Sequence, residues 1–170
     1  MRSMAGTKFD YAPLLAPGRH YRQLTEIEDL CVRPFLKSAM RPNLFARLCT
    51  FVQAIKSADI CCEILVNGSF LTVKNDPSDV DVALLMDPDV AESLNADQEA
   101  LVDAINDNIF IDKVDAFAET LFPIGHASFR LDGNERLWSE QYGSEHNGVY
   151  LKGIAVLRVG ETDVGLRIRR

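Results

Sequence analysis

Two aspartates separated by one residue stand at the start of an apolar run and constrain this chain more than any other feature. Asp79 and Asp81 flank Val80, and the run continues to Met86. Because side chains alternate between the two faces of a strand, both carboxylates would project from one face, roughly 7 Å apart. Two acids on an apolar strand repel each other and resist burial. A hard cation such as Mg²⁺ removes both problems, so the pattern predicts a metal-binding strand within a sheet.

A turn of small residues precedes this strand. Residues 62–66 form a short apolar run that predicts a buried strand, and Gly68 and Ser69 end it ten residues before Asp79. The backbone N–H groups of the turn and the Ser69 hydroxyl are suited to bind nucleotide phosphates. Either motif alone is also typical of an ordinary turn or of a solvated acid pair. Together they indicate metal-assisted phosphoryl or nucleotidyl transfer.

A third carboxylate is needed on a neighbouring strand if two metal ions take part in the transfer. Residues 109–118 predict that strand, and Asp115 lies within it. Asp112 is the alternative, but three residues earlier its side chain would face the other way. We favour Asp115 because it lies further inside the apolar run and is better shielded. The interpretation that both are solvated acids on an edge strand stays open.

The remaining pattern predicts an α/β (α+β) fold, a mixed β-sheet flanked by helices. Thr25 and Glu28 have the spacing of a capping box at the start of one helix. Apolar residues at helical spacing predict further helices over 44–57, with Asn43 as N-cap, and over about 90–106. A last strand is expected within 149–159. By length we expect one domain, over residues 11–170. Residues 1–10 are expected to be disordered.

Charge is distributed unevenly along the chain, whose formal net charge is −7. Residues 75–119 hold 13 Asp and Glu residues and one Lys, while the other residues hold 12 acids and 17 bases. The candidate metal site therefore lies in the acidic segment. Overall acidity argues against broad binding to duplex nucleic acid, which needs a basic stripe, but it does not exclude contact with a short single strand.

The expected location is the cytoplasm, with no membrane partner. No apolar stretch approaches the roughly 20 residues that cross a bilayer, and the N-terminus lacks the apolar core of a signal peptide. The four cysteines have no metal-ligand spacing with a histidine, and two of them are adjacent. We therefore expect reduced thiols packed as small apolar side chains.

The series Gly68-Ser69, Asp79-x-Asp81 and Asp115 resembles the DNA polymerase β-like nucleotidyltransferase superfamily. Within it, the chain is similar to a family of small, largely uncharacterised bacterial nucleotidyltransferase-like proteins. That likeness covers about residues 17–157 and rests on these stretches: Pro17-Gly18-x-His20, Asn67-Gly68-Ser69-Phe70-x-Thr72-x-Lys74-x-x-Pro77-x-Asp79-x-Asp81, and Lys152-Gly153-Ile154.

The resemblance implies a nucleotidyltransferase that moves an NMP from an NTP to an acceptor hydroxyl. Ser69, with Gly68, would bind the terminal phosphates, while Asp79 and Asp81 would hold Mg²⁺. Asp115 would bind the second of two Mg²⁺ ions and help to deprotonate the acceptor.

Further expectations follow from the same resemblance. Lys74 and Lys152 would contact phosphate. The acceptor would be a protein or an RNA, and the partner a toxin or antitoxin, a component of a phage-defence module, or a second copy of the chain. The alternative is a catalytically silent nucleotide-binding or partner-docking module of the same fold.

Overall fold

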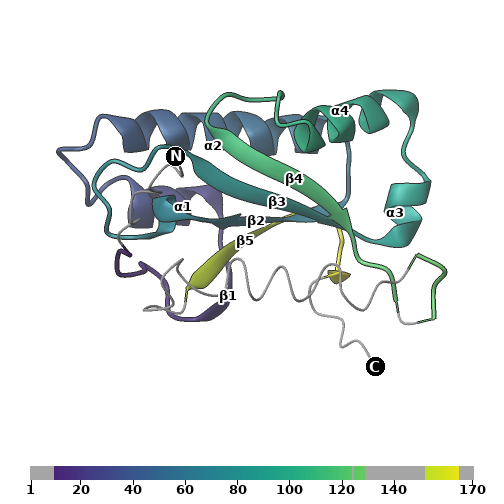
Figure 1. Cartoon of the computed structure of the whole chain (residues 1–170), viewed down its shortest axis with the longest axis horizontal. Coiled ribbons are helices and arrows are strands. Elements are labelled where there is room, and N and C mark those ends of the chain that lie inside the picture. Colours follow the sequence, from purple (N-terminus) through teal and green to yellow (C-terminus); the bar gives the residue numbers. More distant parts are fainter. Residues whose placement is uncertain (1–9, 124, 129–151, 165–170) are drawn as a thin grey trace, which may run out of the picture.

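A five-stranded mixed sheet forms the centre of the structure (Figure 1), which is a computed structural model describing residues 10–123, 125–128 and 152–164. The strand order is β1-β5-β2-β3-β4. The strands are Gly18–Tyr21 (β1), Cys62–Asn67 (β2), Val80–Met86 (β3), Val114–Thr120 (β4) and Gly153–Val159 (β5). The helices of the described residues are Leu24–Cys31 (α1), Met40–Ser57 (α2), Pro88–Glu92 (α3) and Ala96–Asn106 (α4). The predicted α/β class with a mixed sheet is thereby confirmed.

Strand direction brings the two sequence motifs to one end of the sheet. β3 and β4 are parallel, and the connection between them carries α3 and α4. β2 is antiparallel to β3, so the last residues of β2 lie beside the first residues of β3. The glycine turn after β2, Asp81 near the start of β3 and Asp115 near the start of β4 therefore share this end, here called the acidic end of the sheet.

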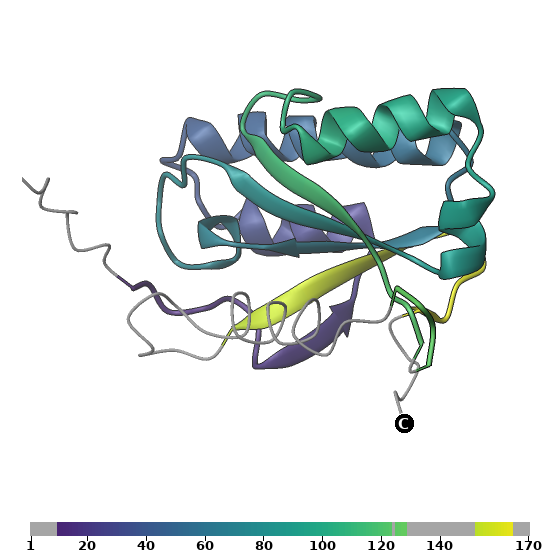
Figure 2. The ribbon, with the colours of Figure 1, turned by 45° about the vertical axis from the view of Figure 1, so that its right-hand side comes forward.

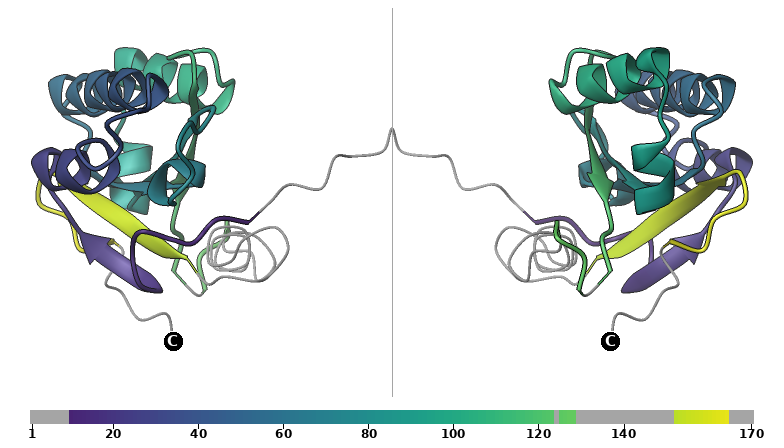
Figure 3. Two further views of the ribbon diagram at one scale, coloured as in Figure 1. Left: turned by 90° about the vertical axis from the view of Figure 1, so that its left-hand side faces the viewer. Right: turned by 90° about the vertical axis from the view of Figure 1, so that its right-hand side faces the viewer.

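The main core lies between the sheet and helices α1, α2 and α4, which Figures 2 and 3 show on one side of the sheet. In β3 the even-numbered residues Val80, Val82 and Leu84 belong to this core. Because strand side chains alternate, Asp81 is directed to the opposite face. The apolar positions of the motif thus fix which face of the sheet carries the acid.

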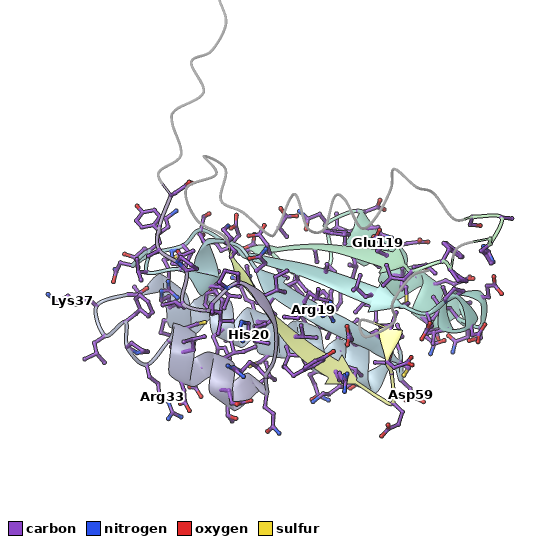
Figure 4. All side chains as sticks on the ribbon, turned by 90° about the horizontal axis from the view of Figure 1, so that it is seen from below. Arg19, His20, Arg33, Lys37, Asp59 and Glu119 are labelled. Atoms are coloured by element: carbon purple, nitrogen blue, oxygen red, sulfur yellow. The ribbon has the colours of Figure 1, made fainter. Side chains whose placement is uncertain are left out.

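The face away from the helices also carries a buried ion cluster at the other end of β2. The Glu63 side chain is 0% exposed and pairs with Arg19 of β1 and Arg158 of β5. Tyr21 donates a hydrogen bond to it (3.2 Å) and lies under the Arg158 guanidinium, 4.1 Å from the ring centroid. Figure 4 labels Arg19 near β5. Since a buried carboxylate is costly unless paired, these contacts explain how Glu63 is tolerated.

Several predicted boundaries were wrong, for local reasons. The capping box of α1 is formed two residues earlier than expected, where Glu26 accepts from the Gln23 N–H (2.7 Å). Helix α2 begins at Met40, so Asn43 lies inside it and is not its N-cap. The helix predicted over 90–106 is two helices, because Asn95 caps α4 by accepting from Asp97 N and Gln98 N.

The strand predictions had two further errors. β4 begins at Val114, since residues 109–113 form the loop that leads into it and Ile109 is exposed. β1 was missed, because the polar sequence Gly18–Tyr21 gives no apolar alternation and is held by pairing with β5. The predicted limits of β2 and β3 agree with the structure to within one residue.

Replacement of Asn95 by alanine is expected to lower the free energy of unfolding by about 1 kcal/mol, because the two amides that it caps lose their acceptor. The matched control is Asn43→Ala. Asn43 accepts an exposed hydrogen bond from Arg47 Nε (2.8 Å). A side-chain pair of this spacing on a helix surface contributes about a few tenths of a kcal/mol. Urea unfolding of both variants measures the difference, and equal losses would contradict the assignment of Asn95 as the cap.

The four cysteines are free thiols, as predicted. Burial raises the pKa of Cys31 to about 12. Within the described residues, no helix is long and apolar enough to cross a membrane. The predicted disorder of residues 1–10 concerns residues outside the described ranges, Asp10 excepted.

Candidate functional site

Three polar side chains form a row across the acidic end of the sheet. In the ladder between β2 and β3, Asn67 pairs with Asp81, and in the ladder between β3 and β4, Asp81 pairs with Asp115. Residues paired across neighbouring strands present their side chains to the same face. Asn67, Asp81 and Asp115 therefore lie side by side on the face away from the helices.

Burial decreases along this row. Asn67 is buried (2% exposed), Asp81 is half-buried and Asp115 is exposed. Asp79 is half-buried and lies one residue before β3 begins. The row thus passes from the interior of the sheet to solvent, so a ligand that binds the outer carboxylates can approach from outside.

Gly68 connects the turn to the acid row. Its backbone has φ 78° and ψ −165°, a combination that is nearly restricted to glycine. A Cβ atom placed on Gly68 would lie 1.6 Å from Asp81 Oδ2 and 2.6 Å from Asp81 Cγ. The Asp81 carboxylate therefore occupies the space that a side chain at position 68 would need. The glycine is required for its backbone angles and for this close approach.

Ser69 begins a single 3-10 turn, Ser69–Leu71, that closes the chain after the glycine. The Leu71 N–H donates to Gly68 O (3.1 Å), and both the N–H and the hydroxyl of Thr72 donate to Ser69 O (3.2 and 2.8 Å). The half-buried Ser69 is thus held next to the acid row by backbone bonds. Its sequence gives the reason: glycine permits the sharp change of direction and Thr72 supplies the closing hydroxyl.

The two candidates for the third carboxylate lie in different places. Asp115 is paired with Asp81, whereas Asp112 lies in the loop before β4 and forms an ion pair with Arg47 of α2 (3.3 Å). Between them Lys113 has φ 62°, which is uncommon for a residue with a side chain. The Lys113 carbonyl accepts from Val80 N (3.0 Å), which joins this loop to the start of β3. The geometry therefore favours Asp115.

The two candidate lysines are less closely tied to the acid row. The Lys74 ammonium lies 5.9 Å from the centroid of the Tyr11 ring. Lys152 is half-buried directly before β5. Because Val66 pairs with Ala155 in an antiparallel ladder, Lys152 and Ser69 both continue past the same end of the sheet. Of the two lysines, Lys152 is therefore better placed to contact a ligand beside Ser69.

Carboxylate oxygens and a neighbouring amide make up the donor set of this site. Such hard oxygen ligands suit Mg²⁺, which binds through one or two carboxylates together with substrate phosphates. Across the part of the chain that the structure describes, no three His, Cys, Asp or Glu side chains are gathered into a preformed metal site. The residues thus fit a cation that is completed by phosphate oxygens.

The sequence analysis did not identify two residues that contribute to this region. Asn67 belongs to the quoted motif, but its pairing with Asp81 depends on strand register, which the sequence does not specify. Arg41 of α2 is fully buried and its guanidinium bonds to the loop after Ser69. No sequence signal could have found it, because its acceptors are backbone carbonyls.

The fold and the acidic end define an α/β protein in which a glycine turn and paired aspartates meet on the face of a mixed sheet that is directed away from α1, α2 and α4. Residues 7–158 match DUF6932, which is described as a family of unknown function. The chain therefore belongs to the DUF6932 family. No curated protein and no solved structure matches it.

Proposed function

We propose that this protein is a metal-dependent nucleotidyltransferase with a DNA polymerase β-like fold, which moves an NMP from an NTP to an acceptor hydroxyl. The observation that carries the proposal is the register pairing of Asp81 with Asp115 beside a glycine turn packed against the Asp81 carboxylate. A surface acid pair would need neither the partner acid on the next strand nor the glycine. Both features support a site for a phosphate-bound cation.

In this proposal the acids and the turn have separate roles. Asp79 and Asp81 would hold Mg²⁺ together with the NTP phosphates. Asp115, on the neighbouring strand, would bind the second ion. Mg²⁺ would neutralise the phosphate charge. Ser69 and Gly68 position the terminal phosphates, and Lys152 and Lys74 are the cations available to them.

The reaction is a displacement at the α-phosphorus of the NTP. The acceptor oxygen forms a bond to that phosphorus while the bond to the bridging oxygen of pyrophosphate breaks. Asp115 accepts the proton of the acceptor hydroxyl, and pyrophosphate leaves with the electron pair of the broken bond. Exposure of Asp115 is consistent with this role, because the acceptor must reach it from solvent.

Asp115→Asn is expected to lower transfer by about 100-fold or more, because the amide removes a metal ligand and the proton acceptor. Asp112→Asn is the matched control, since it removes the same charge only three residues away. Asp112 itself pairs with Arg47 and not with Asp81. The assay uses each α-labelled NTP with Mg²⁺ and a mixture of total RNA and total protein as acceptors. Sensitivity of the product to RNase or protease identifies the acceptor class. Equal activity of the two variants would contradict the role of Asp115.

A second candidate function is a catalytically silent module that binds nucleotide or docks to a partner. It is favoured by the exposure of Asp115 on the edge strand β4, because an acid at that position can be solvated without a metal ion. Calorimetric titration with NTP and Mg²⁺ separates the two functions. Binding without label transfer would support the silent module. A toxin, antitoxin or second copy of the chain as partner, and a cytoplasmic location, remain part of the proposal.

A further inference from the structure

Arg41, the second residue of α2, is the largest charged side chain of the described core and is 0% exposed. Its guanidinium donates hydrogen bonds to five backbone carbonyls. The acceptors and distances are Cys31 O (2.7 Å), Phe70 O (2.8 Å), Thr72 O (2.6 Å), Lys74 O (2.5 Å) and Asn75 O (3.2 Å). Since a guanidinium has five N–H donors, this set uses its whole capacity.

Four of the five acceptors belong to the loop between Ser69 and Asp79, here called the connecting loop (residues 70–78). Carbonyls of the even-numbered residues 70, 72 and 74 face Arg41. The other edge of the loop is held by the segment before β1, where Leu14 N donates to Leu71 O (2.8 Å) and Val73 N donates to Ala12 O (2.9 Å). The loop is therefore fixed like a strand between two partners, one of which is a single side chain.

The segment before α2 provides two additional attachments near this guanidinium. Ser38 Oγ donates to the Asp76 carboxylate (2.7 Å) and accepts from Arg41 N (3.1 Å). The Phe35 ring lies 3.6 Å from the Arg41 Cζ atom, measured to the ring centroid. Burying a charge without a carboxylate in direct contact is costly, so the arrangement needs all of these contacts together. A side chain with fewer donors could not satisfy the same carbonyls.

We propose that Arg41 is a positioning residue of the nucleotide site, which sets the distance and orientation between the phosphate-binding turn at Ser69 and the metal-binding acid Asp79. The inference rests on the proposed function. The connecting loop joins Ser69 to Asp79 along the chain. Arg41 fixes the backbone of this loop over residues 70–75. Arg41 does not contact the nucleotide; it acts through the loop.

The test is Arg41→Lys, which keeps the positive charge but offers three donors in place of five. Arg33→Lys is the matched control, because Arg33 makes only exposed ion pairs with Glu28 and Asp29 at the end of α1, where Figure 4 labels it. We expect Arg41→Lys to weaken binding of a non-hydrolysable NTP with Mg²⁺ by about tenfold or more, and the control to leave it unchanged within about twofold. Binding is measured well below the midpoint of thermal unfolding, so that both variants are folded.

A merely structural role would lower the unfolding temperature and leave the affinity of the folded protein unchanged. Hydrogen exchange supplies an independent readout: protection of the amides at residues 71–76 should fall in Arg41→Lys while protection in β2 and β3 is retained. If Arg41→Lys does not fold, Ser38→Ala removes the attachment to Asp76 and the acceptor of the Arg41 N–H, keeps the Arg41 side chain, and should weaken binding by about two- to fivefold.

The outcomes separate this inference from the proposed function. If the wild type binds the nucleotide and Arg41→Lys, or Ser38→Ala in its place, binds it equally well, the positioning role is overturned while the proposed function stands. If the wild type binds no NTP in the presence of Mg²⁺, both are overturned. Selective loss of affinity together with loss of protection in the connecting loop supports the inference.

Discussion

Replacing Asp79 and Asp81 together by asparagine is expected to reduce nucleotidyl transfer by about 10³-fold or more, because both ligands of one cation are lost and Mg²⁺ contributes several kcal/mol of charge stabilisation. The folded state should survive. Asparagine has nearly the same shape, and the change removes negative charges that repel Asp115, which is directly paired with Asp81. The measurement is transfer of an α-labelled NMP at saturating Mg²⁺.

The same variant makes a prediction about stability. Without metal, the free energy of unfolding should be unchanged or higher by up to about 1 kcal/mol, since like charges opposite one another in a sheet are destabilising. Mg²⁺ with nucleotide should raise the unfolding temperature of the wild type by mass action, and this rise should be absent in the variant. Loss of stability in the absence of metal would instead indicate that the acids serve the fold.

A matched control keeps the change in net charge equal. Asp103→Asn with Asp112→Asn also removes two acids from the acidic segment, but these are exposed residues of α4 and of the loop before β4. It should retain transfer within about threefold, because long-range effects of exposed charges are screened by salt. If this control lost as much activity as Asp79→Asn with Asp81→Asn, the effect would belong to the overall charge and not to the proposed metal ligands.

The strands that carry the acids could be predicted because they are apolar runs ended by turn residues. β3 has the predicted limits, Val80–Met86, and β2 differs by one residue. β1 could not be predicted, since an edge strand held by pairing with β5 needs no apolar alternation. In the sequence, Thr25-x-x-Glu28 has the preferred residues of a capping box, whereas the structure forms the box with Gln23 and Glu26, and glutamine is not a preferred N-cap residue.

The acid row itself was only half accessible from the sequence. Alternation along a strand predicts a common face for Asp79 and Asp81, and the structure places Asp81 in the row while Asp79 lies one residue before β3 begins. Pairing of Asp81 with Asp115 depends on register between strands that are more than 25 residues apart, and no local pattern encodes it. The role of Arg41 could not be predicted from the sequence for a different reason. Its guanidinium bonds to backbone carbonyls, and every residue has one, so the accepting residues need not be of any particular type.

Gly68→Ala is expected to lower the free energy of unfolding by about 2–4 kcal/mol and to remove most activity, because backbone strain and overpacking each cost roughly 1–3 kcal/mol. Strain arises from the backbone at φ 78°, ψ −165°. Overpacking arises because the new Cβ would lie 1.6 Å from Asp81 Oδ2. Gly18→Ala is the control: its φ is also positive, at 118°, but nothing lies within 4 Å of its Cβ, so it should show strain alone and retain transfer.

A double-mutant cycle separates the two causes. Asp81→Ala removes the two nearest atoms, Oδ2 and Cγ, but leaves Asp81 Cβ at 3.1 Å from the new methyl group. The loss of stability from Gly68→Ala should therefore be smaller in the Asp81→Ala background by about 1–2 kcal/mol, as is usual for residues in contact. Activity should not return, because the carboxylate is absent. Additive effects on stability would mean that the glycine is needed only for its backbone angles. A coupling of the expected sign would show that the turn and the acid form one unit, in which the glycine makes room for the Asp81 carboxylate.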